Sequence, residues 1–290
     1  MTTTTVDARR VTGATQTQQQ IRTALKYVGL TLLTLLWLVP VIAAFITSFR
    51  TMDDISINGF WSVPGVLTFE NFQHAWVDAR VNKYLLNSFI ITVPSLFMMM
   101  FLSSMSAYAL ARFKFRGNLF FYFMYVAGTL LPFQILLLPV FRLTNALGFY
   151  NTYGALILIH TAFQLGFCTF VLRNFMRTVP NEILDAARLD GCSEFRIYWQ
   201  IMLPLTLPAL AALGTLEFTW VFNDYLWAII LVQSDSLRPV TAGLATLRGQ
   251  YNTDWPVITA GALLATLPTL LMFVFLQRYF IQGLTLGSGK

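Results

Sequence analysis

The stretch that decides the fold lies in the second half of the chain and reads Thr178-Val-Pro-Asn-Glu-Ile-Leu-Asp-Ala-Ala-Arg-Leu-Asp-Gly-Cys-Ser-Glu-Phe-Arg-Ile-Tyr-Trp-Gln-Ile-Met-Leu-Pro204. Its first half has the signals of a short helix. Thr178 can cap such a helix, and Pro180 suits its opening turn because the missing N–H would have no partner there. Glu182 places negative charge near the positive end of the helix dipole.

A sharp corner and a second helix follow within the same stretch. Gly191 supplies the left-handed C-terminal position that other residues enter only at a cost. Ser193 can cap the second helix, and Pro204 marks the next break because proline interrupts helical hydrogen bonding. We interpret this helix–glycine–helix elbow, which lies between apolar segments, as an element that another protein grips.

The composition outside the elbow is that of an all-α polytopic membrane protein. Only 11% of the residues are charged, about half the share of a typical soluble domain. The apolar residues form separate long runs that no soluble core would use. The net charge of +6 does not indicate a nucleic-acid partner, because the basic residues flank the apolar runs and membrane lipid surrounds them.

The apolar runs predict six transmembrane helices. Residues 1–24 are expected to be a disordered tail, and residues 25–290 the transmembrane domain, with the elbow loop at 173–204. Each run is long enough to cross roughly 30 Å of hydrocarbon. The predicted spans are about 25–49, 84–111, 119–141, 153–172, 205–231 and 256–276.

The distribution of Lys and Arg predicts which side of the membrane holds the elbow. Six spans place both termini, the 112–117 loop and the elbow on one side. Basic residues are concentrated on the cytoplasmic side of membrane proteins, and this side carries most of them. They are Arg9, Arg10, Arg22, Lys26, Arg112, Lys114, Arg116, Arg173, Arg177, Arg188, Arg196, Arg278 and Lys290, against Arg50, Arg80, Lys83, Arg142, Arg238 and Arg248.

The elbow resembles the "EAA" loop of ABC-importer permeases, whose pattern is E-A-A-x3-G-x9-I-x-L-P. Every spacing of the pattern is kept, and the one departure is an Asp in place of the usual Glu. The matching residues are Asp185, Ala186, Ala187, Gly191, Ile201, Leu203 and Pro204. The resemblance implies a type I ABC-importer permease fold in which these residues, with Asp190, couple the permease to an ATPase.

Further segments resemble the carbohydrate-uptake branch of this family, of the type of the smaller maltose permease. The likeness covers about residues 25–290. The segments that carry it are Asn87-Ser88, Ala107-Tyr-Ala-Leu-Ala-Arg112, Leu147-Gly-Phe-Tyr-Asn-Thr-Tyr153, Asn223-Asp224 and Gln277-Arg-Tyr-Phe-Ile-Gln-Gly-Leu-Thr-Leu-Gly287. Phe222 stands where that branch usually has Trp before Asn-Asp.

The resemblance also implies partners and a division of labour. The expected complex contains a second homologous permease, two cytosolic ATPase subunits and an extracytoplasmic sugar-binding protein. ATP and Mg²⁺ would be bound by the ATPase subunits, so this chain is expected to have no cofactor and no enzymatic activity. The apolar face of the elbow, with candidates Ile183, Leu184, Ala187 and Leu189, would fill a groove on an ATPase subunit.

A second group of candidates concerns the path of the substrate. Glu217 is the acidic residue deep in a predicted span, and such residues are costly unless they face a cavity or a polar partner. It either lines the path or forms a hydrogen bond in the interface between two permeases. The other path candidates are Trp220, Asn223, Asp224 and Tyr225, whereas His160 is expected to be a packed, hydrogen-bonded side chain.

Three functions are consistent with the sequence. The first is an ABC permease for a mono- or oligosaccharide, and the second is an ABC permease for another solute, such as a polyol or glycerol phosphate. The third is an ion-coupled secondary transporter that uses Glu217. No His/Glu/Cys spacing typical of a metal site and no catalytic triad is present. We expect the first function, because the third leaves the elbow unexplained.

Overall fold

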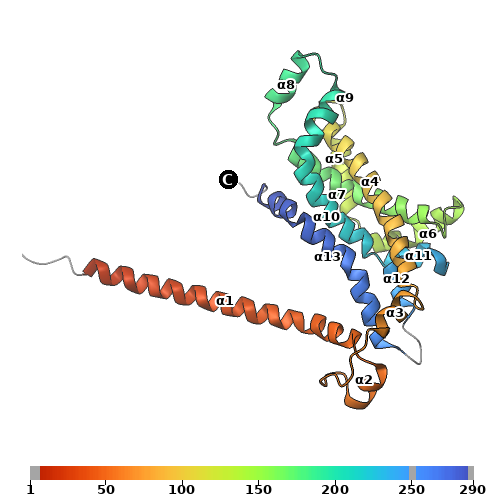
Figure 1. The fold of residues 1–290 in the computed structure, drawn as a ribbon. Coiled ribbons are helices and arrows are strands. Elements are labelled where there is room, and N and C mark those ends of the chain that lie inside the picture. The colour runs from red at the N-terminus through yellow and green to blue at the C-terminus, as the bar shows by residue number, and fades with distance from the viewer. Residues whose placement is uncertain (1–6, 248–252, 287–290) are drawn as a thin grey trace, which may run out of the picture. The chain divides into compact units, whose positions relative to one another are not determined.

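The computed structural model of the chain describes residues 7–247 and 253–286 (Figure 1). It divides into two compact units, one of residues 1–71 with 255–260 and one of residues 72–254 with 261–290. The described ranges are helical, and apart from one isolated bridge between Arg50 and Leu67 they contain no β-structure. The prediction of an all-α protein is confirmed.

The described chain contains long helices joined by shorter ones. They are α1 (Asp7–Ser48), α2 (Met52–Asn58), α3 (Glu70–Trp76), α4 (Val81–Arg112), α5 (Asn118–Leu130), η1 (Phe133–Leu136), α6 (Leu137–Ala146), α7 (Tyr153–Met176), α8 (Asn181–Leu189), α9 (Glu194–Ile197), η2 (Tyr198–Met202), α10 (Leu203–Phe222), α11 (Leu226–Leu231), η3 (Asp235–Leu237), α12 (Val240–Ala245) and α13 (Trp255–Leu286).

Five of these helices are long and apolar enough to cross a membrane. Their spanning segments are Gln18–Ser48, Val81–Arg112, Tyr153–Met176, Glu194–Phe222 and Trp255–Gln277. The pair formed by Asn118–Leu130 and Phe133–Ala146 meets the same test together, but it is bent by 90° at the break. The described chain therefore has five candidate spans by length and composition, or six if the bent pair counts as one.

The predicted third span, 119–141, is thus not a straight helix. Leu131, which precedes Pro132, takes an extended conformation with φ −72° and ψ 126°. A residue before proline is pushed out of the helical region, and proline has no N–H to continue the ladder. The predicted fifth span, 205–231, also divides, because α10 ends at Phe222 and α11 begins only at Leu226.

The N-terminal segment also differs from the prediction. Residues 7–24, expected to be a disordered tail, are the first turns of α1, and residues 1–6 lie outside the described residues. Extending an existing helix costs far less than nucleating a new one, and Gln, Ala, Arg and Lys are good helix formers. The apolar span that follows supplies the nucleus from which this helix extends.

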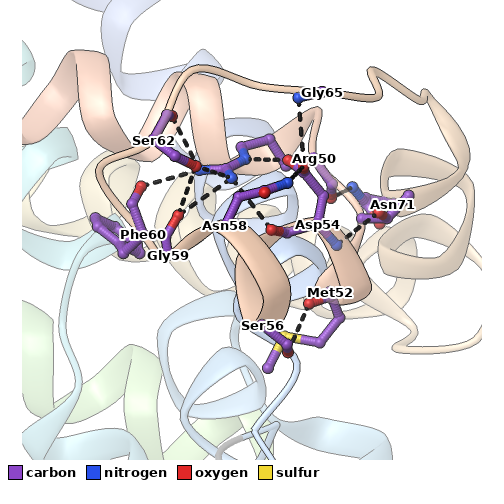
Figure 2. A network of polar contacts seen from close by, with 11 residues as sticks. Arg50, Met52, Asp54, Ser56, Asn58, Gly59, Phe60, Ser62, Gly65 and Asn71 are labelled. Carbon is purple, nitrogen blue, oxygen red and sulfur yellow. Dashed lines mark hydrogen bonds and ion pairs between the residues drawn. The ribbon is translucent and has the colours of Figure 1, made fainter.

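In the smaller unit, the chain beyond α1 is folded around one buried arginine (Figure 2). The Arg50 side chain is fully buried, and its Nε donates to Asp54 Oδ2 at 2.6 Å. Its terminal nitrogens donate to the backbone carbonyls of Gly59 (3.2 Å) and Phe60 (2.9 Å) and to Ser62 Oγ (2.7 Å). The guanidinium therefore satisfies the carbonyl groups of a loop that has no regular secondary structure of its own.

The other oxygen of Asp54 completes the network. Asp54 Oδ1 accepts from Asn58 Nδ2 at 2.8 Å and from the Gly65 N–H at 3.3 Å. The hydrogen bond from Arg50, more than any other contact, holds the pKa of Asp54 below its ordinary value. Each charge of the pair is thus matched by several donors or acceptors, which is the condition under which a buried ion pair is tolerated.

In the larger unit, α4, α7 and α10 pack against one another and form the core (Figure 1). Small hydroxyl residues on α4, including Ser95, Ser103 and Ser104, are fully buried and permit close helix contacts. The three helices carry α8 and α9 at one end, and α6, α11 and α12 lie toward the other. The elbow is therefore built on the end of a packed bundle.

Candidate functional site

The corner of the elbow is a Schellman motif, in which a left-handed residue ends a helix and the following N–H groups bond back to it. Gly191 has φ +77°, as predicted. Its N–H donates to the Arg188 carbonyl at 3.0 Å, and the Cys192 N–H donates to the Ala187 carbonyl at 3.0 Å. The last carbonyls of α8 are thereby satisfied inside the chain, so the direction of the corner is set by its own hydrogen bonds.

The start of α8 differs from the prediction. Thr178 does not cap the helix, because its Oγ1 donates to the Phe175 carbonyl at 2.8 Å and so closes the end of α7. Pro180, expected in the opening turn, occupies the cap position itself. Glu182 lies in the first turn, as expected.

The second helix begins as predicted but does not break where expected. Ser193 Oγ accepts from the Arg196 N–H at 3.4 Å and caps α9. Pro204, expected to mark a break, lies in the first turn of α10. A wider π turn, η2, precedes the proline, and in it the Leu203 N–H donates to the Tyr198 carbonyl. The helix therefore continues although Pro204 has no N–H to donate. The elbow consequently continues into a membrane helix without a hinge.

One arginine joins the two arms of the elbow. Arg188 Nη1 donates to Asp185 Oδ1 at 2.7 Å within α8, and its Nε donates to Glu194 Oε1 at 2.7 Å in α9. These hydrogen bonds, with Glu194 contributing most, raise the pKa of Arg188. The second oxygen of Glu194 accepts from the Tyr108 hydroxyl at 2.8 Å. The corner is thus connected to α4 through a charge-assisted chain.

A second arginine fixes the connection between α7 and α8. Arg112, the last residue of α4, donates from Nη2 to the Val179 carbonyl at 2.7 Å and to the Met176 carbonyl. Its Nη1 donates to Asn181 Oδ1 at 2.5 Å, at the first residue of α8. From the sequence, Arg112 was assigned as a topology marker and as the end of a segment that resembles the family, but not as a support of the elbow. Its position four residues after Tyr108, on the same face of α4, was the available signal.

The structure separates the predicted coupling residues into an outward and an inward group. Asp185, Ala186, Asp190 and Gly191 are exposed, as is Pro204, whereas Ile201 and Leu203 are partly buried. Ala187 is buried together with Leu184 in the core of the bundle.

The expected apolar face of the elbow is accordingly corrected. Leu184 and Ala187 pack against their own chain, where α8 meets the bundle, and leave no surface for a partner. The exposed apolar side chains are Ile183, which is 42% exposed, Leu189, which is 89% exposed, and Phe195, which is 67% exposed. Hydrophobic periodicity identified the apolar positions of α8, but it did not distinguish those that face the bundle from those that face outward.

The candidates for the substrate path are also divided by their surroundings. Glu217 is buried near Cys168 of α7, and its Oε2 has no hydrogen-bond partner among the described residues. The Asp224 carboxylate accepts from the Ala228 N–H at 3.2 Å and lies 3.7 Å from His160 Nε2. Both carboxylates therefore point into the chain's own core.

The remaining path candidates lie near the end of α10. Trp220 is 58% exposed, and Asn223 and Tyr225 are exposed as well. The Asn223 amide donates to the Thr219 carbonyl at 2.8 Å. These three side chains are exposed, whereas Glu217 is buried. His160 is buried beside Asp224, as expected for a packed histidine.

Comparisons with known proteins agree with this architecture. Residues 99–285 match the family described as binding-protein-dependent transport system inner membrane component. The chain is 35% identical to the probable ABC transporter permease protein YurM of Bacillus subtilis, over 88% of this chain and 83% of that protein. It is 34% identical to the arabinooligosaccharides transport system permease protein AraQ of Halalkalibacterium halodurans, over 91% and 95%. Both relatives span nearly the whole described chain.

Solved structures show the same fold. A chain of a bacterial ABC transporter involved in the import of the acidic polysaccharide alginate superposes with a TM-score of 0.80. The alignment covers 96% of this chain and 100% of that chain at 20% identity, which establishes the fold alone. The predicted resemblance to ABC-importer permeases is therefore confirmed. The chain belongs to the family of inner membrane components of binding-protein-dependent transport systems.

Proposed function

We propose that this chain is a permease subunit of an ATP-driven importer that moves a mono- or oligosaccharide across the cytoplasmic membrane by alternating access. The sugar is supported by relatives whose names specify arabinooligosaccharides, diacetylchitobiose and α-glucosides. Polyols and glycerol phosphate are the alternative cargo. Coupling to the ATPase would be the same for all of these solutes. Uptake measured with each solute in turn therefore decides which one is transported.

The observation that carries the proposal is the construction of the elbow. Its corner is closed by the hydrogen bonds around Gly191, and its base is held by Arg112 and Arg188. A rigid element transmits displacement, whereas a flexible loop would absorb it. The surface of α8 that is left for a partner includes the apolar side chains of Ala186 and Leu189 and the charged side chain of Asp185.

The proposed complex contains a second homologous permease, two cytosolic ATPase subunits and an extracytoplasmic sugar-binding protein. The ATPase subunits bind ATP and Mg²⁺ and carry out hydrolysis, and the chain described here supplies no catalytic group. Both termini and the elbow face the cytoplasm, in line with the concentration of Lys and Arg on that side. Closure of the ATPase pair then moves the elbow and, through Arg112 and Glu194, the end of α4.

For the substrate path, we propose that Trp220, Asn223 and Tyr225 contact the sugar. They are exposed at the end of α10, and aromatic faces with neighbouring amides suit sugar rings and hydroxyls. Glu217 and Asp224 do not contact the sugar in this proposal, but hold α10 and its C-terminal end in place from inside the bundle. Glu217→Gln keeps the shape of the side chain, and altered transport with intact assembly is the result expected if the residue acts on the path.

Purification in mild detergent followed by mass spectrometry of the stable partners tests the assembly. Recovery of a second permease, an ATPase and a binding protein is the expected result. Ala186→Trp then tests the elbow, because the side chain is exposed and a bulky ring should block docking without disturbing the core. Ala186→Ser is the matched control, and it should retain ATP-dependent uptake in proteoliposomes. Uptake by the chain alone without ATP would overturn the proposal in favour of a secondary transporter.

A further inference from the structure

A basic pocket lies beside the elbow in the larger unit. It has a volume of about 630 Å³ and lies between the end of α4, the connection to α5 and the last turns of α7. Lys114, Arg173 and Arg177 line it, and no acidic residue does. The pocket concentrates three positive charges where two membrane helices end.

Arg173 is a nearly buried cation whose two Nη groups stay accessible at the pocket. The residue is only 8% exposed, and its Nε donates to the Leu110 carbonyl at 3.3 Å. Its guanidinium carbon lies 3.9 Å from the centre of the Tyr122 ring. Within residues 7–247 and 253–286, no carboxylate pairs with Arg173 and no acceptor receives a hydrogen bond from its two Nη groups. A buried cation without an anionic partner is costly, so a bound anion would stabilise this site.

The two other cations of the pocket are exposed and free to approach such an anion. Lys114 lies in the connection after α4, and Arg177 follows the last residue of α7. Arginine presents its donors in a planar fork that matches a phosphate, and lysine adds a point charge. Two arginines and a lysine around one cavity therefore suit a phosphate group.

The rest of the pocket wall is apolar. Phe113, Phe115 and Leu119 line it and are 39%, 42% and 60% exposed. A soluble phosphate or an acidic protein side chain would gain nothing from these residues. A phospholipid gains from both parts, because its phosphate can meet the cations while the start of its acyl chains covers the apolar wall.

We propose that this pocket binds the phosphate headgroup of an anionic phospholipid from the cytoplasmic leaflet. The site goes beyond sugar import, and it rests on the proposed function only for the side of the membrane. Arg177 immediately precedes the turn that leads into α8, so a bound headgroup braces the base of the elbow. Anionic lipid would thereby strengthen coupling between the ATPase and the membrane helices.

The test measures lipid retention by native mass spectrometry on the full-length chain with its copurified partners. Dioleoylphosphatidylglycerol and dioleoylphosphatidylcholine are supplied in turn, and the anionic lipid should be retained preferentially. Lys114→Gln and Arg177→Gln should each lower that preference about five-fold, the usual effect of one basic residue at an anionic surface. Arg116→Gln is the matched control, because Arg116 lies in the same connection and is exposed but does not line the pocket.

Three results would overturn the proposal. An equal loss in Arg116→Gln would assign lipid binding to diffuse surface charge. Displacement of the lipid by millimolar inorganic phosphate would make the pocket a site for a soluble anion. Retention by the chain alone that vanishes when the ATPase is bound would assign the pocket to a partner's acidic side chain. Because retention is measured without transport and can also be measured on the chain alone, a failure of the import proposal can be told apart from a failure of lipid binding.

Discussion

The corner residue Gly191 permits a prediction whose size can be worked out from the geometry. Its φ of +77° lies in the left-handed region, and a Cβ added there would meet no atom within 4 Å. Replacement by another residue therefore adds no clash, and the whole cost comes from the backbone conformation. That cost is about 1–2 kcal/mol for a residue such as Ala and is larger for a β-branched residue.

A strain of this size acts on the hydrogen bonds that close the corner. The Gly191 and Cys192 N–H groups bond to carbonyls of α8, and both bonds open when the residue leaves the left-handed region. A cost of about 1–2 kcal/mol raises the population of the open corner roughly 5- to 30-fold. Asn tolerates the left-handed region better than Ala, so Gly191→Asn should show a much smaller change.

Hydrogen exchange on the purified chain measures this opening directly. We expect amides 190–192 to exchange roughly 5- to 30-fold faster in Gly191→Ala and faster still in Gly191→Val. The amides of α7 should be unchanged. Coupled uptake by the assembled importer should decline in the same order, with Gly191→Asn close to the wild type.

Two results would refute this reasoning. If Asn impairs coupling as strongly as Val while exchange at the corner stays slow, the added side chain collides with a partner and backbone strain is not the cause. If none of the variants changes exchange, the left-handed corner is not required for the elbow to close.

The remaining predictions concern the supports of the fold. Asp54→Asn should speed proteolysis within residues 51–65, whereas Asp53→Asn, whose side chain is exposed, should not. Because Arg50 and Asn58 lower the pKa of Asp54, the carboxylate should protect this loop fully above the ordinary value of about 4 and lose its effect only as the pH falls through the lowered pKa. Protection that declines already near pH 6 would contradict this assignment. Gly166→Leu should destabilise the chain by about 1–3 kcal/mol in a detergent melt, because its Cβ would lie 2.7 Å from the Tyr125 carbonyl oxygen of α5. Gly214→Leu, which meets nothing within 4 Å, is the control, and equal melting temperatures would refute the close contact. Arg112→Gln should speed hydrogen exchange at residues 178–181 while Arg116→Gln does not, and no difference between the two would remove Arg112 from the support of the elbow.

Local signals in the sequence were sufficient to predict the end of the first elbow helix at Gly191 and the start of the second at Ser193. Gly191 and Ser193 act through their own backbone and the next few residues, so their conformations follow from nearby chemistry. Thr178 does not cap α8, because its hydroxyl donates to the Phe175 carbonyl at the end of α7. Pro204 failed as a break because the π turn before it already accommodates the missing donor.

Long-range contacts account for what the sequence analysis missed. Arg112 was noted only as a topology marker and in a family segment, and Glu194 was not singled out at all. The roles of both arise from partners on other helices. Glu217 was recognised as unusual, but only packing shows that it lies near Cys168. The direction in which a side chain points depends on how helices rotate against one another, and a single sequence contains no measure of that rotation.

The sequence by itself determined that this is an all-α membrane protein with a capped elbow between membrane helices, because hydropathy, helix caps and glycine conformations act over a few neighbouring residues. The spacing of the elbow also determined the family. Only the tertiary structure decided that Leu184 and Ala187 face inward, that the third span bends by 90°, and that Arg173 lines a pocket of cations. These features depend on contacts between residues far apart in the chain. Once helices pack, the energies of such contacts exceed the intrinsic conformational preferences of single residues.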